Sequence, residues 1–319
     1  MTGAHAGALR THAPAKVNLG LRITARRADG FHALGSVFLR LDLADELTMA
    51  DAPGPTDTLV VEGDPRCPVE GNLALAALAA WRARMGHLGP VAIHLRKRIP
   101  MEAGLAGGSS DAAAVLRLLA RRHDPGDVPL RSIGASVGSD VPFFVEAVGA
   151  ALVSGTGDML EPLPPPIEPL GVLLVRPPIG LATGRVFGAW DALRAERSKD
   201  PASPIDELAA ELRAGTDPLT LLDLAARLRD ANDLWAAAVH LEPLLDAVRG
   251  ALEDRLGRPV LMSGSGSTLF ALYPDPDQAR RAAELLRADM SGPLAGCWVE
   301  ASASGTPYPP DVVSEEEGA

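Results

Sequence analysis

Residues 104–110, Gly-Leu-Ala-Gly-Gly-Ser-Ser, have the composition of a loop that binds phosphate. Glycines let the backbone approach a phosphate closely and adopt positive φ, so that successive N–H groups can point inward. A helix predicted to begin near Ser109 would add its unpaired N–H groups and the positive end of its dipole. The run therefore predicts an anion site, and the alternative is a flexible turn followed by an ordinary serine N-cap.

Two common nucleotide motifs are excluded by residue identity. No Gly-Lys-Ser/Thr follows the glycines, so the loop is not a Walker P-loop, and it lacks the Gly-x-Gly-x-x-Gly dinucleotide pattern. We expect the segment to hold a nucleotide triphosphate through Pro100, Met101, Glu102, Ala103, Gly104, Leu105, Ala106, Gly107, Gly108, Ser109 and Ser110.

Three other segments have residue types that could contribute chemistry. Lys16 and Asn18 are two apart in a predicted strand and so share its polar face, unless this is only an exposed strand surface. Asp140, in Gly138-Ser-Asp-Val-Pro-Phe-Phe, could be a rigidly held carboxylate or an acid that closes a turn before proline. Residues 263–268, Ser-Gly-Ser-Gly-Ser-Thr, form either a tight glycine turn or a second wall for a phosphate chain.

The composition narrows the class of protein. With 47% hydrophobic residues the chain can bury a sizeable core, and a net charge of −11 argues against non-specific nucleic-acid binding. Its two cysteines, Cys67 and Cys297, could form one disulfide, but nothing indicates a disulfide framework. No apolar run resembles a signal peptide or a membrane span. We expect a cytoplasmic protein, monomeric or homodimeric, without a nucleic-acid or membrane partner.

Hydrophobic periodicity gives the elements that must position these residues. The predicted strands cover residues 13–24, 36–43, 46–49, 58–62, 91–99, 149–154, 171–176, 259–263, 268–273 and 297–300. The predicted helices cover residues 72–85, 109–123, 130–137, 183–194, 205–214, 219–230, 234–240, 242–256 and 276–289. The fold class is therefore α+β, and the glycine run lies between a strand and a helix.

A proline-rich segment divides the chain. Prolines at positions 162, 164, 165, 166 and 169 mark the boundary, and 319 residues suit about two domains. We expect an N-terminal domain over residues 1–162 and a C-terminal domain over residues 163–301. Residues 302–319 are polar and acidic, which predicts a disordered tail.

The motifs and their order resemble those of the GHMP kinases, a superfamily of ATP-dependent small-molecule kinases. Its phosphate loop, Pro-x-x-x-Gly-Leu-x-x-x-Ser-Ser, matches residues 100–110, and its strand motif and C-terminal glycine turn match residues 13–21 and 263–268. The resemblance covers nearly the whole chain. It implies an N-terminal ATP-binding and catalytic domain of the ribosomal protein S5 domain 2-like type and a C-terminal ferredoxin-like α/β sandwich.

Within the superfamily, Arg27-Ala-Asp-Gly-Phe-His-Ala-Leu is the most discriminating segment. It resembles the branch that phosphorylates the 2-hydroxyl of a cytidine-diphosphate-linked methylerythritol, in the non-mevalonate route to isoprenoid precursors. The resemblance implies a phosphotransferase with an alcohol acceptor and with ATP as the phosphoryl donor.

The resemblance also implies residue roles. Asp140 would take the proton from the attacking hydroxyl, and Lys16 would keep Asp140 ionised and stabilise the transferring phosphoryl group. Phe31, His32 and Phe187 would bind the cytosine, although each could instead be a hairpin or core residue. Asn18 would line the erythritol side, with Gly264 and Ser265 also at the substrate. Asn72 and Leu73 match the family segment beside the adenine.

The sequence departs from the family at several positions. Phe31 stands where many relatives have Tyr, and Glu102 and Ala106 stand where some have Gly, so Glu102 must point away from the phosphates. Asp111 replaces an Asn of some members and either helps to hold Mg²⁺ or is a favourable first-turn acid. Mg²⁺ is expected with ATP, but the superfamily's usual metal carboxylate is not evident, so no metal ligand is assigned.

Two other functions compete. Another GHMP kinase, for homoserine or phosphomevalonate, is disfavoured by residues 27–34. A nucleotide-binding regulator that has lost activity is disfavoured because both Lys16 and Asp140 are present. The fold alone does not separate these functions.

Overall fold

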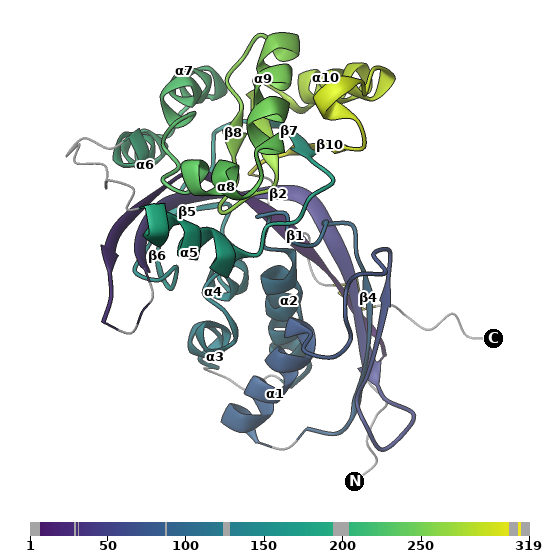
Figure 1. The fold of residues 1–319 in the computed structure, drawn as a ribbon. Coiled ribbons are helices and arrows are strands. Elements are labelled where there is room, and N and C mark those ends of the chain that lie inside the picture. Colours follow the sequence, from purple (N-terminus) through teal and green to yellow (C-terminus); the bar gives the residue numbers. More distant parts are fainter. Residues whose placement is uncertain are drawn as a thin grey trace.

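The structure is a computed structural model, and it describes residues 7–28, 30, 32–86, 88–123, 128–193, 204–305 and 312–313. Two long, paired strands, β1 (Leu9–Arg26) and β2 (His32–Asp51), run through the middle of the molecule (Figure 1). Helices α1 to α4 lie on one side of these strands, and α6 to α10 with the second sheet lie on the other side. The α+β class predicted from the sequence is confirmed.

The N-terminal sheet is organised around β2. Its order is β11-β1-β2-β4-β3, with β4 at Val91–Arg96, β3 at Thr58–Glu62 and β11 at Val312–Val313. The other half of β2 pairs with β5 (Ala150–Ser154), which in turn pairs with β6 (Met159–Leu163). All pairs are antiparallel except β3 with β4.

Four helices cover one face of this sheet. They are α1 (Leu73–Met85), α2 (Gly107–His123), α3 (Leu130–Val137) and α4 (Val141–Val145). The core between helices and sheet is apolar and includes Phe38, Leu47, Ile93, Leu116 and Phe143. Helix α2 is buried along most of its length, so the loop before it has a fixed end.

The C-terminal sheet has the order β10-β7-β9-β8. Its strands are β7 (Gly171–Arg176), β8 (Leu261–Met262), β9 (Leu269–Tyr273) and β10 (Trp298–Ala303). Between β7 and β8 in the chain, the described residues form helices α5 (Thr183–Leu193), α6 (Pro204–Ala214), α7 (Pro218–Leu228), α8 (Trp235–Leu241) and α9 (Leu244–Leu256). Helix α10 (Pro276–Ala288) and the 3-10 turn Gly292–Leu294 precede β10.

The two halves share one apolar core. Val17 and Leu39 of the central strands belong to the same buried cluster as Leu174, Leu208 and Phe270 of the second half. The halves therefore meet through core packing. The proline-rich connection follows β6, which includes Pro162 and ends at Leu163.

Several predicted elements differ from those in the structure. The strands predicted at 36–43 and 46–49 are one strand, β2, which continues through the polar positions between them. Leu39 and Leu41 pack in one core, and Leu47 and Met49 pack in the other. Helix α4 and strand β6 were not predicted, since each is short and contains a proline.

The predicted disordered tail begins too early. Ser302 and Ala303 belong to β10, and the Ser304 amide donates to the Leu170 carbonyl. Val312 and Val313 pair with β1, and the other tail residues beyond 305 lie outside the described residues. Cys67 and Cys297 are both free thiols.

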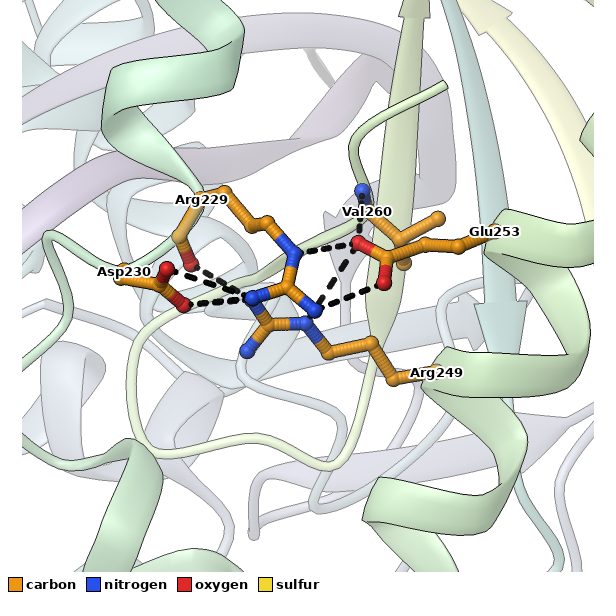
Figure 2. Close-up of polar contacts among 5 residues, drawn as sticks. All are labelled: Arg229, Asp230, Arg249, Glu253 and Val260. Atoms are coloured by element: carbon orange, nitrogen blue, oxygen red, sulfur yellow. Dashed lines mark hydrogen bonds and ion pairs between the residues drawn. The ribbon is translucent and has the colours of Figure 1, made fainter. Parts of the chain in front are cut away.

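An ion-pair cluster holds the end of α7 against α9 and β8 (Figure 2). Arg229 donates to both carboxylate oxygens of Glu253 at 2.6 and 2.7 Å, and Arg249 donates to Asp230 at 2.7 Å. Glu253 also accepts the Val260 amide at 3.1 Å. The cluster fixes the segment that follows α7, which hydrogen-bonds to Leu21 of β1.

We predict that Glu253→Gln lowers the free energy of unfolding by about 1 kcal/mol at pH 7, because a bidentate but partly exposed pair is lost. The Arg229 hydrogen bond lowers the pKa of Glu253. The contribution is therefore present above the pKa of an unfolded Glu and disappears as pH falls through the lowered folded pKa. Urea unfolding of both proteins at neutral and acidic pH measures this. Asp277→Asn is the control, because Asp277 and Arg280 are mostly exposed, and it should change little. Equal destabilisation by both substitutions would contradict the prediction.

Candidate active site

A cavity of about 780 Å³ lies where the two halves meet. It is lined by β1 and β2, by the glycine-rich loop (residues 100–108) and the first turn of α2, by the turn before α4, by α5 and by residues 264–265. The predicted site residues that line it are Lys16, Asn18, His32, Leu73, Pro100, Met101, Glu102, Ala103, Gly104, Leu105, Ala106, Gly107, Gly108, Ser109, Asp140, Phe187, Gly264 and Ser265. The fold thus brings together residues from both ends of the sequence.

Lys16 and Asp140 form an ion pair in this cavity. The Lys16 Nζ lies 3.6 Å from Asp140 Oδ2, and it donates to Asn18 Oδ1 at 2.6 Å and to the Gly104 carbonyl at 3.2 Å. The Lys16 residue is only 3% exposed, so the interpretation of β1 as a solvent-exposed face is wrong. Burial lowers the pKa of Lys16, and the charge of Asp140 opposes this shift.

Asp140 is held by the turn that precedes α4. It occupies the N-cap position of that helix, yet its side chain makes no capping hydrogen bond and is 27% exposed. A carboxylate that neither caps the helix nor is buried can face the cavity and accept a proton there. The alternative of an acid that only closes a turn does not account for the ion pair with Lys16.

Asn18 positions Lys16. Its Oδ1 accepts from Lys16, and its Nδ2 donates at 2.9 Å to Ser36 Oγ, which donates to the Gly20 carbonyl at 2.6 Å. The β1–β2 register shifts between Pro14 and Lys16, an irregularity that re-aims the side chains beside it. Because these bonds use both ends of the Asn18 amide, a direct contact of Asn18 with the substrate stays a prediction.

The glycine turn at residues 263–268 is a wall of the same site. Gly104 has a φ of +73°, and a Cβ there would lie 2.3 Å from the Ser263 carbonyl oxygen. Gly264 has a φ of +56°, and a Cβ there would lie 3.0 Å from Asn18 Oδ1. Ser263 Oγ donates to the Gly104 carbonyl at 2.9 Å. The two glycine segments therefore pack backbone to backbone beside Lys16.

Helix α2 begins two residues earlier than predicted, at Gly107. Gly107 and Gly108 are in its first turn and Ser109 lies within the helix, so the interpretation of Ser109 as an N-cap is wrong. Glycines in the first turn leave the amides there uncovered, which suits an anion at the positive end of the dipole. Ser110 is fully buried and does not line the cavity.

At the other end of the cavity lies an aromatic group. His32 stacks on Phe187 with ring centroids 5.1 Å apart and meets Trp190 edge-on. His32 Nε2 is 2.9 Å from Asp191 Oδ1, which fixes the orientation of the imidazole. The aromatic faces of His32 and Phe187, together with the fixed ring nitrogens of His32, suit contact with a planar, polar ring such as a pyrimidine. Phe31 lies outside the described residues.

Asn72 and Glu102, both predicted at the ATP site, contact other parts of the chain. Asn72 does not line the cavity: its Oδ1 caps α1 by accepting the Ala74 amide, and its Nδ2 donates to the Pro68 carbonyl. Glu102 has a φ of +52° and lies against Gly180, where a Cβ would be 2.2 Å from Glu102 Oε2. Its carboxylate therefore faces the start of the second half.

Several residues of the site were not found from the sequence. Lys97 lines the cavity and is buried with Asp45 and Asp111. Asn232 is also buried, and its Nδ2 donates to the Met262 and Gly264 carbonyls, which holds the glycine turn. Lys97 lies in the basic run Arg96-Lys97-Arg98, and Asn232 lies near Asp230 and Asp233, so in sequence both resemble surface residues and neither signals a partner.

No metal site is preformed in the part of the chain that the structure describes, where no group of three His, Cys, Asp or Glu side chains could hold an ion. Among the helices described, none is long and apolar enough to cross a bilayer.

Each half of the chain matches a domain of the same protein family. Residues 72–147 match the GHMP kinases N terminal domain, and residues 209–292 match the GHMP kinases C terminal domain. A curated relative from Novosphingobium aromaticivorans, named 4-diphosphocytidyl-2-C-methyl-D-erythritol kinase, is 39% identical over 85% of this chain and 86% of its own.

Solved structures of GHMP kinases match the fold of this chain. A crystal structure of 4-(cytidine 5'-diphospho)-2C-methyl-D-erythritol kinase is 37% identical, has a TM-score of 0.70 and covers 93% of this chain and 100% of its own. Homoserine kinase from Cytophaga hutchinsonii has a TM-score of 0.68 over 97% of this chain and 98% of its own. Its identity is only 18%, so it supports the fold and not the substrate.

We predict that Gly104→Ala disrupts the site. A left-handed φ costs a non-glycine residue about 1–2 kcal/mol, and the Cβ would also overlap the Ser263 carbonyl. Thermal unfolding and ATP titration should show a lower Tm and at least about tenfold weaker binding, equivalent to about 1.4 kcal/mol. The control is Gly257→Ala at the end of α9, which also has a left-handed φ but has nothing within 4 Å of a Cβ and lies outside the cavity, so it should lower the Tm without weakening ATP binding. If both variants bound ATP normally, the packing of residue 104 on residue 263 would be irrelevant to the site.

Proposed function

The chain belongs to the GHMP kinases, and from this premise we propose that it transfers the γ-phosphoryl group of ATP to the 2-hydroxyl of 4-diphosphocytidyl-2-C-methyl-D-erythritol. This reaction would place it in the non-mevalonate pathway to isoprenoid precursors. The 37% identical crystal structure and the curated relatives, which bear the name of that kinase, support this proposal over other members of the family.

One observation carries the proposal: a single cavity holds the Lys16–Asp140 pair at one part and the His32–Phe187 stack at another. A kinase for a cytidine-linked alcohol needs a base beside the phosphate loop and a platform for the pyrimidine. The cavity volume of about 780 Å³ is in the range of sites for small organic ligands.

In the proposed reaction, Asp140 accepts the proton of the substrate 2-hydroxyl, whose oxygen then attacks the γ-phosphorus in line with the leaving ADP oxygen. Lys16 stabilises the Asp140 carboxylate and the charge on the transferring group. Residues of the glycine-rich loop and the first turn of α2 hold the phosphates. Such positioning and charge stabilisation supply most of the catalysis in phosphoryl transfer.

The cofactor and the cellular setting follow from this proposal. Mg²⁺ would enter with ATP and neutralise phosphate charge, with phosphate oxygens and waters among its ligands. We also propose that the enzyme works in the cytoplasm, as a monomer or homodimer, on this small-molecule substrate and without a nucleic-acid partner.

The test is ATP turnover with the cytidylated alcohol, homoserine and phosphomevalonate measured side by side. We expect turnover only with the cytidylated alcohol. Turnover with one of the others would leave a GHMP kinase of different specificity, and ATP binding without any turnover would favour an inactive regulator.

We predict that Asp140→Asn lowers kcat by about 10²–10⁴-fold with little change in ATP affinity, because the amide keeps the shape but cannot take a proton. Steady-state kinetics and ATP titration on the purified variant measure this. Asp217→Asn, at the N-cap of α7 and outside the cavity, is the control and should keep the wild-type kcat. A near wild-type kcat for Asp140→Asn would remove Asp140 from the chemistry.

We predict that His32→Ala raises KM for the cytidylated substrate by about tenfold while kcat changes less. The lost contact is made equally before and at the transition state, so it affects binding rather than the chemical step. His94→Ala serves as the control, since His94 pairs with Glu62 outside the cavity. An unchanged KM for His32→Ala would overturn the cytosine assignment.

A further inference from the structure

Beneath the glycine-rich loop lies a buried ion cluster of Asp45, Lys97 and Asp111, here called the Lys97 cluster. Lys97 Nζ donates to Asp45 Oδ2 and, at 2.7 Å, to Asp111 Oδ2. The three side chains are at most 2% exposed. Burying charges is costly unless they are paired, so a cluster in this position requires a reason.

The cluster joins the two ends of the loop. Asp45 comes from β2, and its Oδ1 accepts the amides of Arg98 at 2.5 Å and Ile99 at 2.8 Å, just where β4 leads into the loop. Asp111 comes from the first two turns of α2, just after the loop ends. Lys97 therefore ties the entrance of the loop to its exit and to the central sheet.

The cluster is also part of the site wall. Lys97 and Ile99 line the cavity, and a Cβ on Gly107 would lie 3.3 Å from Lys97 Nζ and 3.0 Å from Ile99 Cγ2. The glycine at the start of α2 thus rests directly on the cluster. A change of shape or charge in the cluster would be felt by the phosphates bound at that helix end.

We propose that Asp45, Lys97 and Asp111 are positioning residues for ATP: the cluster holds the glycine-rich loop in its binding shape, and it does so with one proton shared between its two carboxylates. This inference rests on the proposed function, because it assigns a role toward the nucleotide of that reaction. It also gives a role to Asp111, whose Oδ2 accepts from Lys97 and whose side chain is buried, so Asp111 is not a free first-turn acid.

The charges of the three side chains explain why the cluster would hold one proton. One ammonium balances one carboxylate, so a second buried carboxylate would leave the cluster with a net negative charge beside the phosphate site. Burial, opposed by the charge of Lys97, raises the pKa of Asp111 to about 8. Burial alone would lower the pKa of Lys97, but Asp111 and Asp45 outweigh it and raise that pKa to about 12. Among the described residues, Cys67 also faces the cluster, and burial raises the pKa of its thiol.

The protonated cluster is neutral and should bind ATP well, whereas the deprotonated cluster is negative and repels it. ATP affinity should therefore fall as pH rises through about 8, by up to about tenfold between about pH 7 and pH 9, the limit for one linked proton. Asp111→Asn resembles the protonated acid at every pH, because its amide can accept from Lys97 and donate to Asp45. Its affinity should stay within about twofold of the wild-type value at about pH 7 and lose this pH dependence.

The experiment is calorimetric titration of the full-length protein with Mg²⁺ and a non-hydrolysable ATP analogue across this pH range. The proteins are wild type, Asp111→Asn, Asp111→Leu and the control Asp57→Asn. Asp57 pairs with Arg82 and accepts the Val91 amide in the same half of the chain, but it does not line the cavity. Titration of Lys16 affects every protein equally, so the difference between wild type and Asp111→Asn isolates the Lys97 cluster.

We expect the wild-type Kd to rise with pH by at least about threefold more than the Kd of Asp111→Asn, and we expect Asp111→Leu to bind at least about tenfold more weakly than the wild type. Asp57→Asn should keep the wild-type profile. If Asp111→Leu does not fold, the profile of Asp111→Asn decides alone. Identical profiles for wild type and Asp111→Asn would overturn the proposal, as would wild-type affinity in Asp111→Leu. A wild-type protein that bound no ATP would instead refute the proposed function.

Discussion

The burial of the Lys16 ammonium group is the constraint on which the site depends. Removing an ammonium from water costs several kcal/mol unless its donors find acceptors. Three acceptors come from separate parts of the chain: Asn18 on β1, the Gly104 carbonyl of the glycine-rich loop and the Asp140 carboxylate. Satisfying this one cation therefore fixes the loop, the strand and the turn before α4 relative to one another, which is the pre-organisation that phosphoryl transfer requires.

The second half of the chain completes the site by backbone packing rather than by charge. Gly104 and Gly264 have positive φ and approach the neighbouring segment more closely than any side chain would allow. Asn232 holds the Gly264 carbonyl, and its segment hydrogen-bonds to Leu21 of β1. The shared apolar core makes this contact stable, so the cavity is a property of the whole chain.

The fold class and most residues that line the cavity could be predicted from the sequence, whereas the contacts that hold them together could not. The Gly-Gly-Ser-Ser run, Lys16 and Asp140 have local signatures, because a phosphate loop or a polar residue in an apolar strand depends on its neighbours in sequence. Most helices were found for the same reason. The pairing of Asp45 with Lys97 links residues 52 apart. No periodicity signals such a contact, whereas the capping of α1 by Asn72 joins residues that are neighbours in sequence.

The two buried lysines show how one residue type serves two purposes. Lys16 has one carboxylate partner, which is partly exposed, and burial lowers its pKa. Lys97 has two fully buried carboxylates, and its pKa is raised to about 12. A lysine whose pKa is lowered can respond to charge that develops on a reacting group, whereas a lysine whose pKa is raised by two buried acids stays charged and acts as a structural tie. The number and exposure of the carboxylates, rather than the lysine itself, therefore separate the group that faces the chemistry from the group that shapes the loop.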